Sequence, residues 1–315
     1  AADWRRCDIM PDYGHELEFG YFLDPGASDA SDTLATARFA EDLGYDLIGI
    51  QDHPYVASHL DAWALMSVIL GQTGRLRVFP DVTNLQLRSA ALVAKAAASL
   101  DQLSNGRFEL GLGGGAPFFD EQAVGLGAAP MAPGDRVDAV EEAIAVIRAF
   151  WSGKPDPRVT GIFHQLAGVQ GGPKPAHDMD IWVGGSGPRM LRLIGRAADG
   201  WLIPLMQYMP PGQAASRNAT IDEAAQAAGR DPSDIRRLYN VDGRFTNEPE
   251  GPPSDEDTQI VGPVEHWVEV LTHYAVDFGF STFLLTGPPD QQKLETVIGE
   301  VAPRVREVVA AKRNG

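Results

Sequence analysis

The chain alternates short apolar runs with longer segments of helical periodicity from about residue 17 to its C-terminal end. Eight apolar runs are interpreted as strands, and a helical segment follows each of them. The runs lie within residues 17–23, 45–51, 75–85, 106–112, 181–183, 201–205, 235–245 and 280–285. Several are almost continuously apolar, as expected for parallel strands covered on both faces. This regular alternation predicts an α/β fold, a (β/α)8 TIM barrel, rather than an open doubly wound sheet.

The intervening segments predict the helices and two insertions. Helices are expected within residues 32–43, 61–71, 90–103, 134–151, 188–198, 214–228, 264–278 and 291–311. Asp32 is expected to cap the first helix and Gly44 to end it. Insertions are expected after strand four, with a small hairpin at 159–163 and 165–169, and after strand seven, with the acidic loop 247–257. No change of composition marks a linker, so residues 1–315 are expected to form a single barrel domain.

Composition narrows the classes of function. The formal net charge is −17, so the surface repels phosphate backbones and nucleic-acid binding is not expected. No run of about 20 apolar residues is present and residues 1–20 lack a signal-peptide pattern, so we expect a cytoplasmic protein without membrane association. The one cysteine, Cys7, is interpreted as a free thiol. Neither His-x-x-x-His nor C-x-x-C occurs, so no metal site is expected.

Polar or glycine-rich clusters directly follow several predicted strands. These clusters are Asp52-His53, the segment 81–84, the segment 113–115 and the segment 184–187. In a barrel of this type, chemistry takes place at the carboxyl ends of the strands. The clusters are therefore expected to meet at one mouth of the barrel.

Asp52 and His53 are the candidate catalytic residues. A histidine at the end of a barrel strand can hydrogen-bond or protonate a cofactor or substrate near neutral pH. The alternative is a histidine that only orders its loop, with Asp52 capping that loop. The position directly after the second strand favours the functional interpretation.

The two glycine-rich segments each have a functional and a structural interpretation. Gly184, Gly185, Ser186 and Gly187 stand between a strand and a helix, where backbone N–H groups and the serine can bind a phosphate. The alternative is a tight turn that needs glycine. The segment 113–115 is either the floor beneath a flat ring or a flexible turn. Its spacing lacks the full dinucleotide pattern, so a Rossmann domain is not expected.

Four segments resemble the luciferase-like monooxygenase superfamily. They are YDLIGIQDH at 45–53, DVTNLQLR at 81–88, AKAAASLDQLSNGRFELGLGGG at 94–115 and IWVGGSGPRMLRLIGRAADGW at 181–201. Within this superfamily they are most similar to the coenzyme F420-dependent reductases and dehydrogenases. The resemblance implies a barrel that carries a deazaflavin or flavin ring at its carboxyl mouth, and often a homodimer.

The resemblance also implies roles for individual residues. Asp52 and His53 would lie beside the reactive ring. A non-prolyl cis peptide bond would join Asp81 to Val82, with Asn84 nearby, and would support the ring from behind.

Further cofactor contacts follow from the same resemblance. Gly113 and Gly114 would lie at the ring. The loop containing Gly184, Gly185, Ser186 and Gly187 would help to hold the phosphate or side chain of the cofactor. Arg136 matches an arginine that some FMN-binding relatives use to contact phosphate.

Two departures from the family patterns make particular activities of the family unexpected for this chain. The sequence has Asp52-His53-Pro54 and Gly114 where bacterial luciferases have Glu-His-His and an arginine, so aldehyde luminescence is not expected. It has Ala116 where the F420-dependent glucose-6-phosphate dehydrogenase has a glutamate, which makes sugar-phosphate oxidation doubtful. An apolar rim would favour a less polar substrate, although ordinary packing explains its members equally well. They are Pro54, Tyr55, Phe118, Phe119, Trp201 and Met206.

The leading hypothesis is an F420-dependent oxidoreductase that moves a hydride between deazaflavin C5 and a small, fairly apolar organic substrate. His53 would handle the proton, while Asp52 would set its tautomer or touch the ring. One alternative is an FMN-dependent two-component monooxygenase that uses O2 and receives reduced flavin from a flavin reductase. A second alternative is a flavin-binding paralogue without catalysis. The substrate and the direction of hydride transfer stay open.

Overall fold

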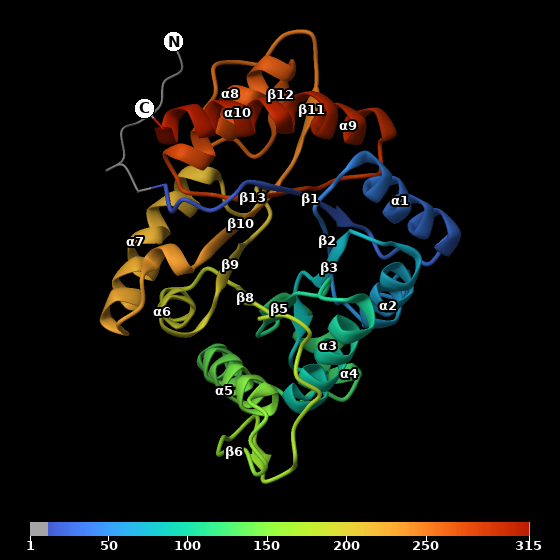
Figure 1. Cartoon of the computed structure of the whole chain (residues 1–315), viewed down its shortest axis with the longest axis vertical. Coiled ribbons are helices and arrows are strands. Elements are labelled where there is room, and N and C mark those ends of the chain that lie inside the picture. Colours follow the sequence, from blue (N-terminus) through green and yellow to red (C-terminus); the bar gives the residue numbers. More distant parts are fainter. Residues whose placement is uncertain (1–11, 315) are drawn as a thin grey trace.

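The computed structural model describes residues 12–314 of the chain. The interpretation of Cys7 as a free thiol therefore falls outside the described residues. Within them, parallel strands form a ring, helices surround this ring, and the main hydrophobic core lies between the two layers (Figure 1).

The main sheet confirms the predicted (β/α)8 barrel. Its hydrogen-bonded order is β3-β2-β1-β13-β10-β9-β8-β5-β4, and the described pairs within it are parallel. β3 and β4 share one position in the barrel because the third strand is interrupted. The strands are β1 (Glu18–Leu23), β2 (Leu47–Ile50), β3 (Arg77–Pro80), β4 (Thr83–Asn84), β5 (Leu110–Gly113), β8 (Ile181–Gly184), β9 (Gly200–Ile203), β10 (Arg236–Val241) and β13 (Thr282–Leu285).

The barrel closes at the interrupted third strand. The N–H of Val78 donates to the carbonyl of Arg107 at 2.9 Å, and its carbonyl accepts from the N–H of Glu109 at 3.1 Å. After Pro80 the chain bulges, and β4 then pairs with the end of β5. The peptide bond between Asp81 and Val82 is cis, as the family resemblance implied.

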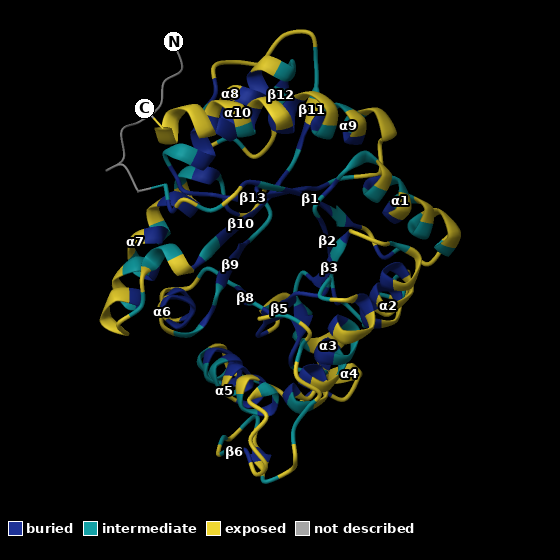
Figure 2. Cartoon of the chain, viewed as in Figure 1, coloured by how far each residue is buried: buried dark blue, intermediate teal, exposed yellow. Residues whose placement is uncertain are grey.

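The helices pack outside the ring of strands, with their buried faces toward it and their exposed faces outward (Figure 2). They are α1 (Ala30–Leu43), α2 (Ala62–Gln72), α3 (Ala90–Ser104), α5 (Pro133–Trp151), α6 (Pro188–Ala197), α7 (Pro211–Ala227), α8 (Val264–Val276), α9 (Gln291–Thr296) and α10 (Ala302–Asn314). A π-helical turn, Val297–Val301, joins the last two. Of the helices within residues 12–314, none combines the length and apolar character needed to span a bilayer.

Several predicted boundaries were wrong by a few residues. Asp29, not Asp32, caps α1, because its carboxylate accepts hydrogen bonds from the N–H groups of Ser31 and Asp32 at 3.1 Å each. Gly44 ends the helix as predicted, with φ of 103°. The fourth barrel strand begins at Leu110 rather than at 106, because Gly106 has a φ of 81° and directly follows the end of α3.

Both predicted insertions are present. After β5, a short 3-10 turn (Pro117–Phe119) and α4 (Asp120–Gly125) precede α5. The expected hairpin is confirmed in a shorter form, as β6 (Arg158–Val159) and β7 (Leu166–Ala167) pair antiparallel.

The insertion after strand seven is built around a separate strand pair. β11 (Gly243–Phe245) pairs with β12 (Ile260–Gly262), and the acidic loop connects them. The sequence had placed residues 243–245 in the barrel strand. That strand instead ends at Val241, where the Asp242 carboxylate accepts from the N–H of Gly243 at 2.8 Å.

The interior of the barrel is filled by large side chains, as is usual for this architecture. The fully buried cluster consists of Leu47, Phe79, Trp182, Leu202, Leu238 and Leu284. The Phe79 and Trp182 rings meet edge-on, with centroids 5.0 Å apart. Val82 packs on this cluster from the bulge. Below the cavity, the barrel interior is therefore closed by this cluster.

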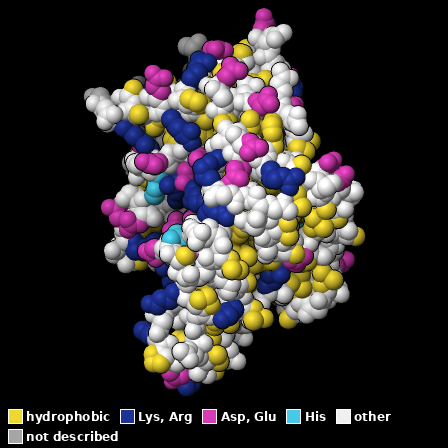
Figure 3. Space-filling model, turned by 45° about the vertical axis from the view of Figure 1, so that its right-hand side comes forward, with side chains coloured by type: hydrophobic (Ala, Val, Ile, Leu, Met, Phe, Trp, Pro, Cys, Tyr) yellow, Lys and Arg dark blue, Asp and Glu magenta, His cyan; other side chains and the backbone are white. Residues whose placement is uncertain are grey.

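Positively and negatively charged side chains are mixed on the surface, although the net charge of the chain is negative. On the face shown in Figure 3, Lys and Arg side chains lie beside Asp and Glu side chains. Exposed ion pairs such as Arg189 with Asp138, at 2.7 Å, contribute to this pattern. Paired surface charges of this kind add little to stability.

The tight closure of the barrel predicts a large effect of Gly111→Ala. A Cβ at Gly111 would lie 2.0 Å from the carbonyl oxygen of Pro80 and 2.9 Å from Leu202 Cδ1. We expect the free energy of unfolding, measured with urea, to fall by about 3 kcal/mol.

The matched control is Gly71→Ala on the exposed face of α2, where no atom lies within 4 Å of the new Cβ. This change should leave the free energy of unfolding unchanged or raise it by about 0.5 kcal/mol. Equal stabilities of the two variants would contradict the close approach of β3 and β5.

Candidate active site

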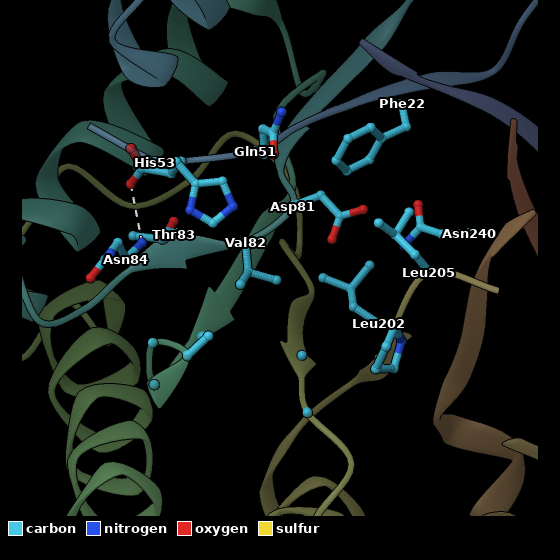
Figure 4. Close-up of a pocket in the computed structure, with 18 of the residues that line it drawn as sticks. Phe22, Gln51, His53, Asp81, Val82, Thr83, Asn84, Leu202, Leu205 and Asn240 are labelled. Carbon is cyan, nitrogen blue, oxygen red and sulfur yellow. Dashed lines mark hydrogen bonds between the residues drawn. The ribbon is translucent and has the colours of Figure 1, made fainter. Parts of the chain in front are cut away.

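A cavity of about 290 Å³ opens at the carboxyl ends of the barrel strands (Figure 4). Residues of β1, β4, β5, β8, β9 and β10 line it, together with the bulge and with residues of the segment 51–55 that follows β2. The structure brings together most of the site residues that the sequence suggested. Those that line the cavity are Asp52, His53, Asp81, Val82, Asn84, Gly113, Gly114, Gly184 and Gly185.

Val82 forms the floor of this cavity. A Cβ at Gly113 would lie 2.3 Å from Val82 Cγ2, and one at Gly184 would lie 3.0 Å from Val82 Cγ1. Both glycines therefore make room for the bulge to turn Val82 inward. Gly113 belongs to β5, so the interpretation of this glycine as part of a flexible turn was wrong. The alternative, a floor beneath a flat ring, stays a prediction.

Asp52 is buried and held by several hydrogen bonds. Arg88 donates to its two carboxylate oxygens through Nε and Nη2, at 2.7 and 2.8 Å. The backbone N–H of Asn84 donates to Oδ2 at 3.1 Å. Arg88 also pairs with Asp61, the N-cap of α2, at 2.6 Å. Asp52 thus joins the end of β2 to β4 and to α2.

His53 is oriented by Tyr55 rather than by Asp52, which corrects the expectation that Asp52 sets the tautomer. Its Nδ1 lies 2.6 Å from the Tyr55 hydroxyl oxygen. Its ring also packs near Phe119, with centroids 5.0 Å apart. When the tyrosine hydroxyl donates to Nδ1, the proton of the neutral imidazole is on Nε2. The sequence reasoning had placed Tyr55 only at an apolar rim.

The pKa values of His53 and Tyr55 agree with a neutral imidazole that accepts a hydrogen bond from the tyrosine hydroxyl. Burial lowers the pKa of His53 below its usual range, His59 lowers it further, and the Asp52 charge opposes this shift. Burial and the Asp52 charge raise the pKa of Tyr55 to about 12. At neutral pH, His53 is therefore neutral and the Tyr55 hydroxyl keeps its proton. Figure 4 shows the His53 ring pointing into the cavity.

The end of the cavity away from His53 is also polar. Asp81 extends from the bulge toward Asn240 on β10, and Phe22, Leu202 and Leu205 lie around them (Figure 4). Burial raises the pKa of Asp81 to about 7, and a hydrogen bond with Asn240 opposes this rise. Asn240 was missed from the sequence, although an amide within an otherwise apolar barrel strand is a usable signal.

Three residues of the lining have a buried side-chain oxygen without a protein partner. In the described part of the chain these oxygens are Oδ2 of Asp81, Oγ1 of Thr83 and Oδ1 of Asn240. A buried polar group without a partner costs about 1–3 kcal/mol, so such groups need an explanation.

The glycine-rich loop after β8 lies only partly in the cavity. Gly184 and Gly185 line it, whereas Ser186 and Gly187 continue outward to the start of α6. Gly185 has a φ of 148° and its carbonyl accepts from Trp201 Nε1 at 2.7 Å. Gly187 is the N-cap and provides no side-chain cap, so the first N–H groups of α6 are available to an anion. The phosphate contact of Ser186 and Gly187 stays a prediction.

Arg136 is engaged inside the protein instead of lining the cavity. It is buried, and its guanidinium donates to the carbonyl of Gly114 at 3.1 Å. It also contacts both Asp120 carboxylate oxygens, at 2.5 and 2.6 Å. These bonds join the end of β5 to α4. A phosphate contact by Arg136 stays a prediction that requires competition with Asp120.

The expected apolar rim is only partly correct. Tyr55 lines the cavity, whereas Trp201 and Met206 are fully buried in the core, so the alternative of ordinary packing is correct for these two. Phe118 is largely exposed, at 72%. No cluster of three or more His, Cys, Asp or Glu side chains that could hold a metal ion occurs within residues 12–314.

A model of the luciferase-like monooxygenase family matches residues 17–242, more than half of the chain. The chain belongs to this family. The family that the sequence motifs suggested is therefore confirmed.

Two curated relatives are reductases. The chain is 33% identical over 201 residues to a 5,10-methylenetetrahydromethanopterin reductase of Methanolobus tindarius, covering 63% of this chain and 57% of the relative. It is 34% identical over 186 residues to a phthiodiolone/phenolphthiodiolone dimycocerosates ketoreductase of Mycobacterium kansasii, covering 58% of this chain and 48% of the relative. The chain thus spans about half the length of the curated relatives it matches.

Solved structures share the fold across nearly the whole chain. An F420-dependent secondary alcohol dehydrogenase in complex with an F420-acetone adduct has a TM-score of 0.80 at 21% identity, covering 92% of this chain and 99% of that chain. An F420-dependent tetrahydromethanopterin reductase from Methanopyrus kandleri has a TM-score of 0.77 at 18% identity, covering 92% of this chain and 100% of that chain. The monooxygenase RslO1 from Streptomyces bottropensis has a TM-score of 0.75 at 18% identity, covering 93% of this chain and 99% of that chain.

The buried pair of Asp52 and Arg88 generates a stability prediction. Arg88→Met would leave the Asp52 carboxylate, whose side chain is 1% exposed, without its charged partner. We expect the free energy of unfolding to fall by about 3 kcal/mol in a urea titration. The double variant with Asp52→Asn should recover part of this loss.

Arg189→Met is the matched control, because Arg189 and Asp138 are about half exposed. Its effect should stay below about 1 kcal/mol. An equally small effect of Arg88→Met would show that Arg88 does not hold Asp52.

Proposed function

We propose that this protein is an oxidoreductase that transfers a hydride between deazaflavin C5 of coenzyme F420 and a small, fairly apolar organic substrate. The observation that carries the proposal is that neutral His53 points into a cavity whose floor is Val82, at the carboxyl mouth of the barrel. The fold likeness to an F420-dependent alcohol dehydrogenase and an F420-dependent reductase supports this choice of cofactor.

The cavity suits a flat heteroaromatic ring with one polar edge. Val82, Leu202 and Leu205 supply apolar surface, while Asp81, Thr83 and Asn240 add polar groups to the lining. Ser186 and Gly187 at the start of α6 would hold the phosphate-bearing side chain. When bound, the deazaflavin supplies the hydride chemistry, and the protein supplies position and electrostatics.

In this proposal, His53 orients the substrate. With Tyr55 at Nδ1, the Nε2–H group can donate a hydrogen bond to a substrate oxygen. Tyr55 and Phe119 pack against the imidazole and limit the access of water to it. Asp52 and Arg88 fix the end of β2, from which His53 projects.

The lining also bears on the class of substrate. Among the described residues that line the cavity, none is Lys or Arg. A substrate with several negative charges would lack a counterion there. This composition favours a neutral molecule, in agreement with the expectation of a fairly apolar substrate.

An FMN-dependent two-component monooxygenase is the second candidate, favoured by the fold likeness to RslO1 and to an FMN-containing Baeyer–Villiger monooxygenase. It would need O2 and a flavin reductase as partner. A flavin-binding paralogue without catalysis is the third. Binding of F420 and of FMN to the purified apoprotein separates the first two. We expect F420 to bind at least about tenfold more tightly, a difference of 1.4 kcal/mol.

A panel of ketones, secondary alcohols and activated alkenes then tests catalysis with the bound cofactor. Binding of FMN alone, with O2 consumption in the presence of a flavin reductase, would favour the monooxygenase. F420 binding without turnover across the panel would favour the paralogue.

His53→Ala should lower turnover with F420 by about 10²-fold or more, because it removes the donor to the substrate oxygen. The dissociation constant of F420, measured by fluorescence, should change little. Turnover equal to that of the unaltered protein would contradict the role of His53.

His15→Ala is the matched control for this variant. Burial lowers the pKa of His15 to about 4, but this residue lies beside Arg236 and Glu18, at the amino-terminal ends of the strands. It should keep the turnover of the unaltered protein. A similar loss in both variants would mean that the effect of His53→Ala is structural.

A further inference from the structure

His53 and Tyr55 form a short hydrogen bond beside the cavity. The Nδ1 atom of His53 lies 2.6 Å from the Tyr55 hydroxyl oxygen, and both residues line the cavity. The other ring nitrogen, Nε2, has no hydrogen-bond partner within residues 12–314 and is not enclosed by them. The imidazole points into the cavity (Figure 4). One nitrogen of this ring can therefore reach a substrate, while the other is bonded to a hydroxyl group.

The side chain of Asn84 favours one direction of this hydrogen bond. The N–H of Gln86 donates to Asn84 Oδ1 at 3.1 Å, which leaves the amide nitrogen of Asn84 to act as a donor. Asn84 lies close enough to Tyr55 to lower the pKa of the tyrosine through a side-chain hydrogen bond, as a donor does. The Tyr55 oxygen thus accepts from Asn84 and keeps its own O–H group to donate to His53 Nδ1. The neutral imidazole then carries its proton on Nε2.

The carboxyl groups of the lining are less suited to give a substrate its proton. Both oxygens of Asp52 accept from Arg88. The unpartnered oxygen of Asp81 is enclosed by protein, at the end of the cavity away from His53. The imidazole of His53 does reach into the cavity, but burial lowers its pKa, so it is neutral at neutral pH. A neutral imidazole that lost its Nε2 proton would become an anion unless Nδ1 gained a proton at the same time.

We infer that Tyr55 and His53 form a proton relay, in which the Tyr55 hydroxyl gives its proton to Nδ1 as Nε2 gives its proton to the substrate oxygen. The inference rests on the proposed function. In the reduction of a ketone, the carbonyl carbon forms a C–H bond with the hydride, and the π electrons move to the oxygen, which takes the Nε2 proton. The substrate is reduced and the deazaflavin is oxidised. The imidazole stays neutral, and the negative charge remains on the Tyr55 oxygen, which accepts from Asn84.

The Tyr55 hydroxyl has its proton available at neutral pH. Burial and the Asp52 charge raise the pKa of Tyr55 to about 12, and Asn84 opposes this rise. Because an alkoxide is more basic than a phenolate, transfer from Tyr55 through His53 to the new alkoxide is favourable. After the product leaves, water at the open mouth protonates Nε2, and the Nδ1 proton returns to the Tyr55 oxygen. Each cycle therefore takes its proton from water.

Nitrogen NMR of the histidine-labelled protein, without cofactor, tests the hydrogen bond on which the relay depends. At neutral pH we expect His53 to be neutral, with its proton on Nε2. Tyr55→Phe removes the donor to Nδ1, so both tautomers should be populated and the two nitrogen shifts of His53 should move toward each other. His53→Ala identifies these signals. A proton on Nδ1 in the unaltered protein would overturn the relay, because the tyrosine would then be the acceptor.

Tyr55→Phe also tests the relay in single-turnover hydride transfer, with reduced F420 and the ketone of the panel that is reduced fastest. We expect the rate to fall by about tenfold or more, and the dissociation constant of F420 to stay within about threefold. In the unaltered protein, the rate should decrease in D2O and curve when plotted against the D2O fraction, because both protons move. In the variant this plot should be straight. An unchanged rate and an equally curved plot would overturn the relay.

The double variant of His53→Ala with Tyr55→Phe separates a relay from two independent effects. Residues that act as a unit have effects that do not add. The double variant should therefore have the rate of His53→Ala alone, because Tyr55 acts through His53. A further loss equal to that of Tyr55→Phe alone would contradict the relay, since Tyr55 would then affect the rate by another route.

Tyr45→Phe is the matched control, because it also removes a hydrogen-bonded tyrosine hydroxyl. The hydroxyl of Tyr45 donates to the carbonyl of Leu294 at 3.2 Å, and the residue precedes β2 at the amino-terminal end of that strand. This variant should keep the rate and the D2O dependence of the unaltered protein. An equal loss in both variants would mean that the effect of Tyr55→Phe is structural.

The outcomes distinguish the relay from the proposed function. Failure to bind F420, or binding without reduction of any ketone in the panel, would overturn the proposed function. The histidine NMR signals would still report whether His53 carries its proton on Nε2. Reduction of a ketone with F420, together with an unchanged rate in Tyr55→Phe, would overturn the relay alone.

Discussion

The barrel closes where the third strand meets β5, with Pro80 and Gly111 in close approach, and the candidate site depends on this closure. The third strand pairs with β2 up to Pro80, leaves the sheet at the bulge and resumes pairing with β5 as β4. Because Gly113 and Gly184 lack side chains, Val82 can turn inward between their strands. One interruption in a strand therefore produces both the floor of the cavity and the inward position of Asp81.

The polar groups around this floor divide into supporting and available groups. Arg88 and Asn84 hold Asp52, and Tyr55 holds one nitrogen of His53. Asp81 keeps a buried oxygen without a partner at the other end of the cavity. The supporting hydrogen bonds hold Asp52 and His53 in fixed positions at the mouth of the cavity.

The local sequence pattern was sufficient to predict much of the fold and the location of the site. The eight apolar runs predicted the barrel, because the spacing of apolar residues and the length of each run distinguish strands from helices. The clusters at 52–53 and 81–84, and Gly184 and Gly185 of the third, lie at one mouth as expected, because parallel strands share their carboxyl ends. The boundaries were less accurate. Asp29 and Asp32 are equally suitable caps in sequence, and only the backbone conformation distinguishes them.

The sequence by itself determined the architecture, the family and the mouth at which polar residues collect. Only the tertiary structure decided which side chains meet, because those contacts join distant parts of the chain. Asp52 contacts Arg88 rather than His53, and Asp81 faces Asn240 from across the barrel. Trp201, expected at the rim, lies in the core. Residue type and order establish the strands, whereas the register and curvature of a closed sheet establish which of their residues face one another.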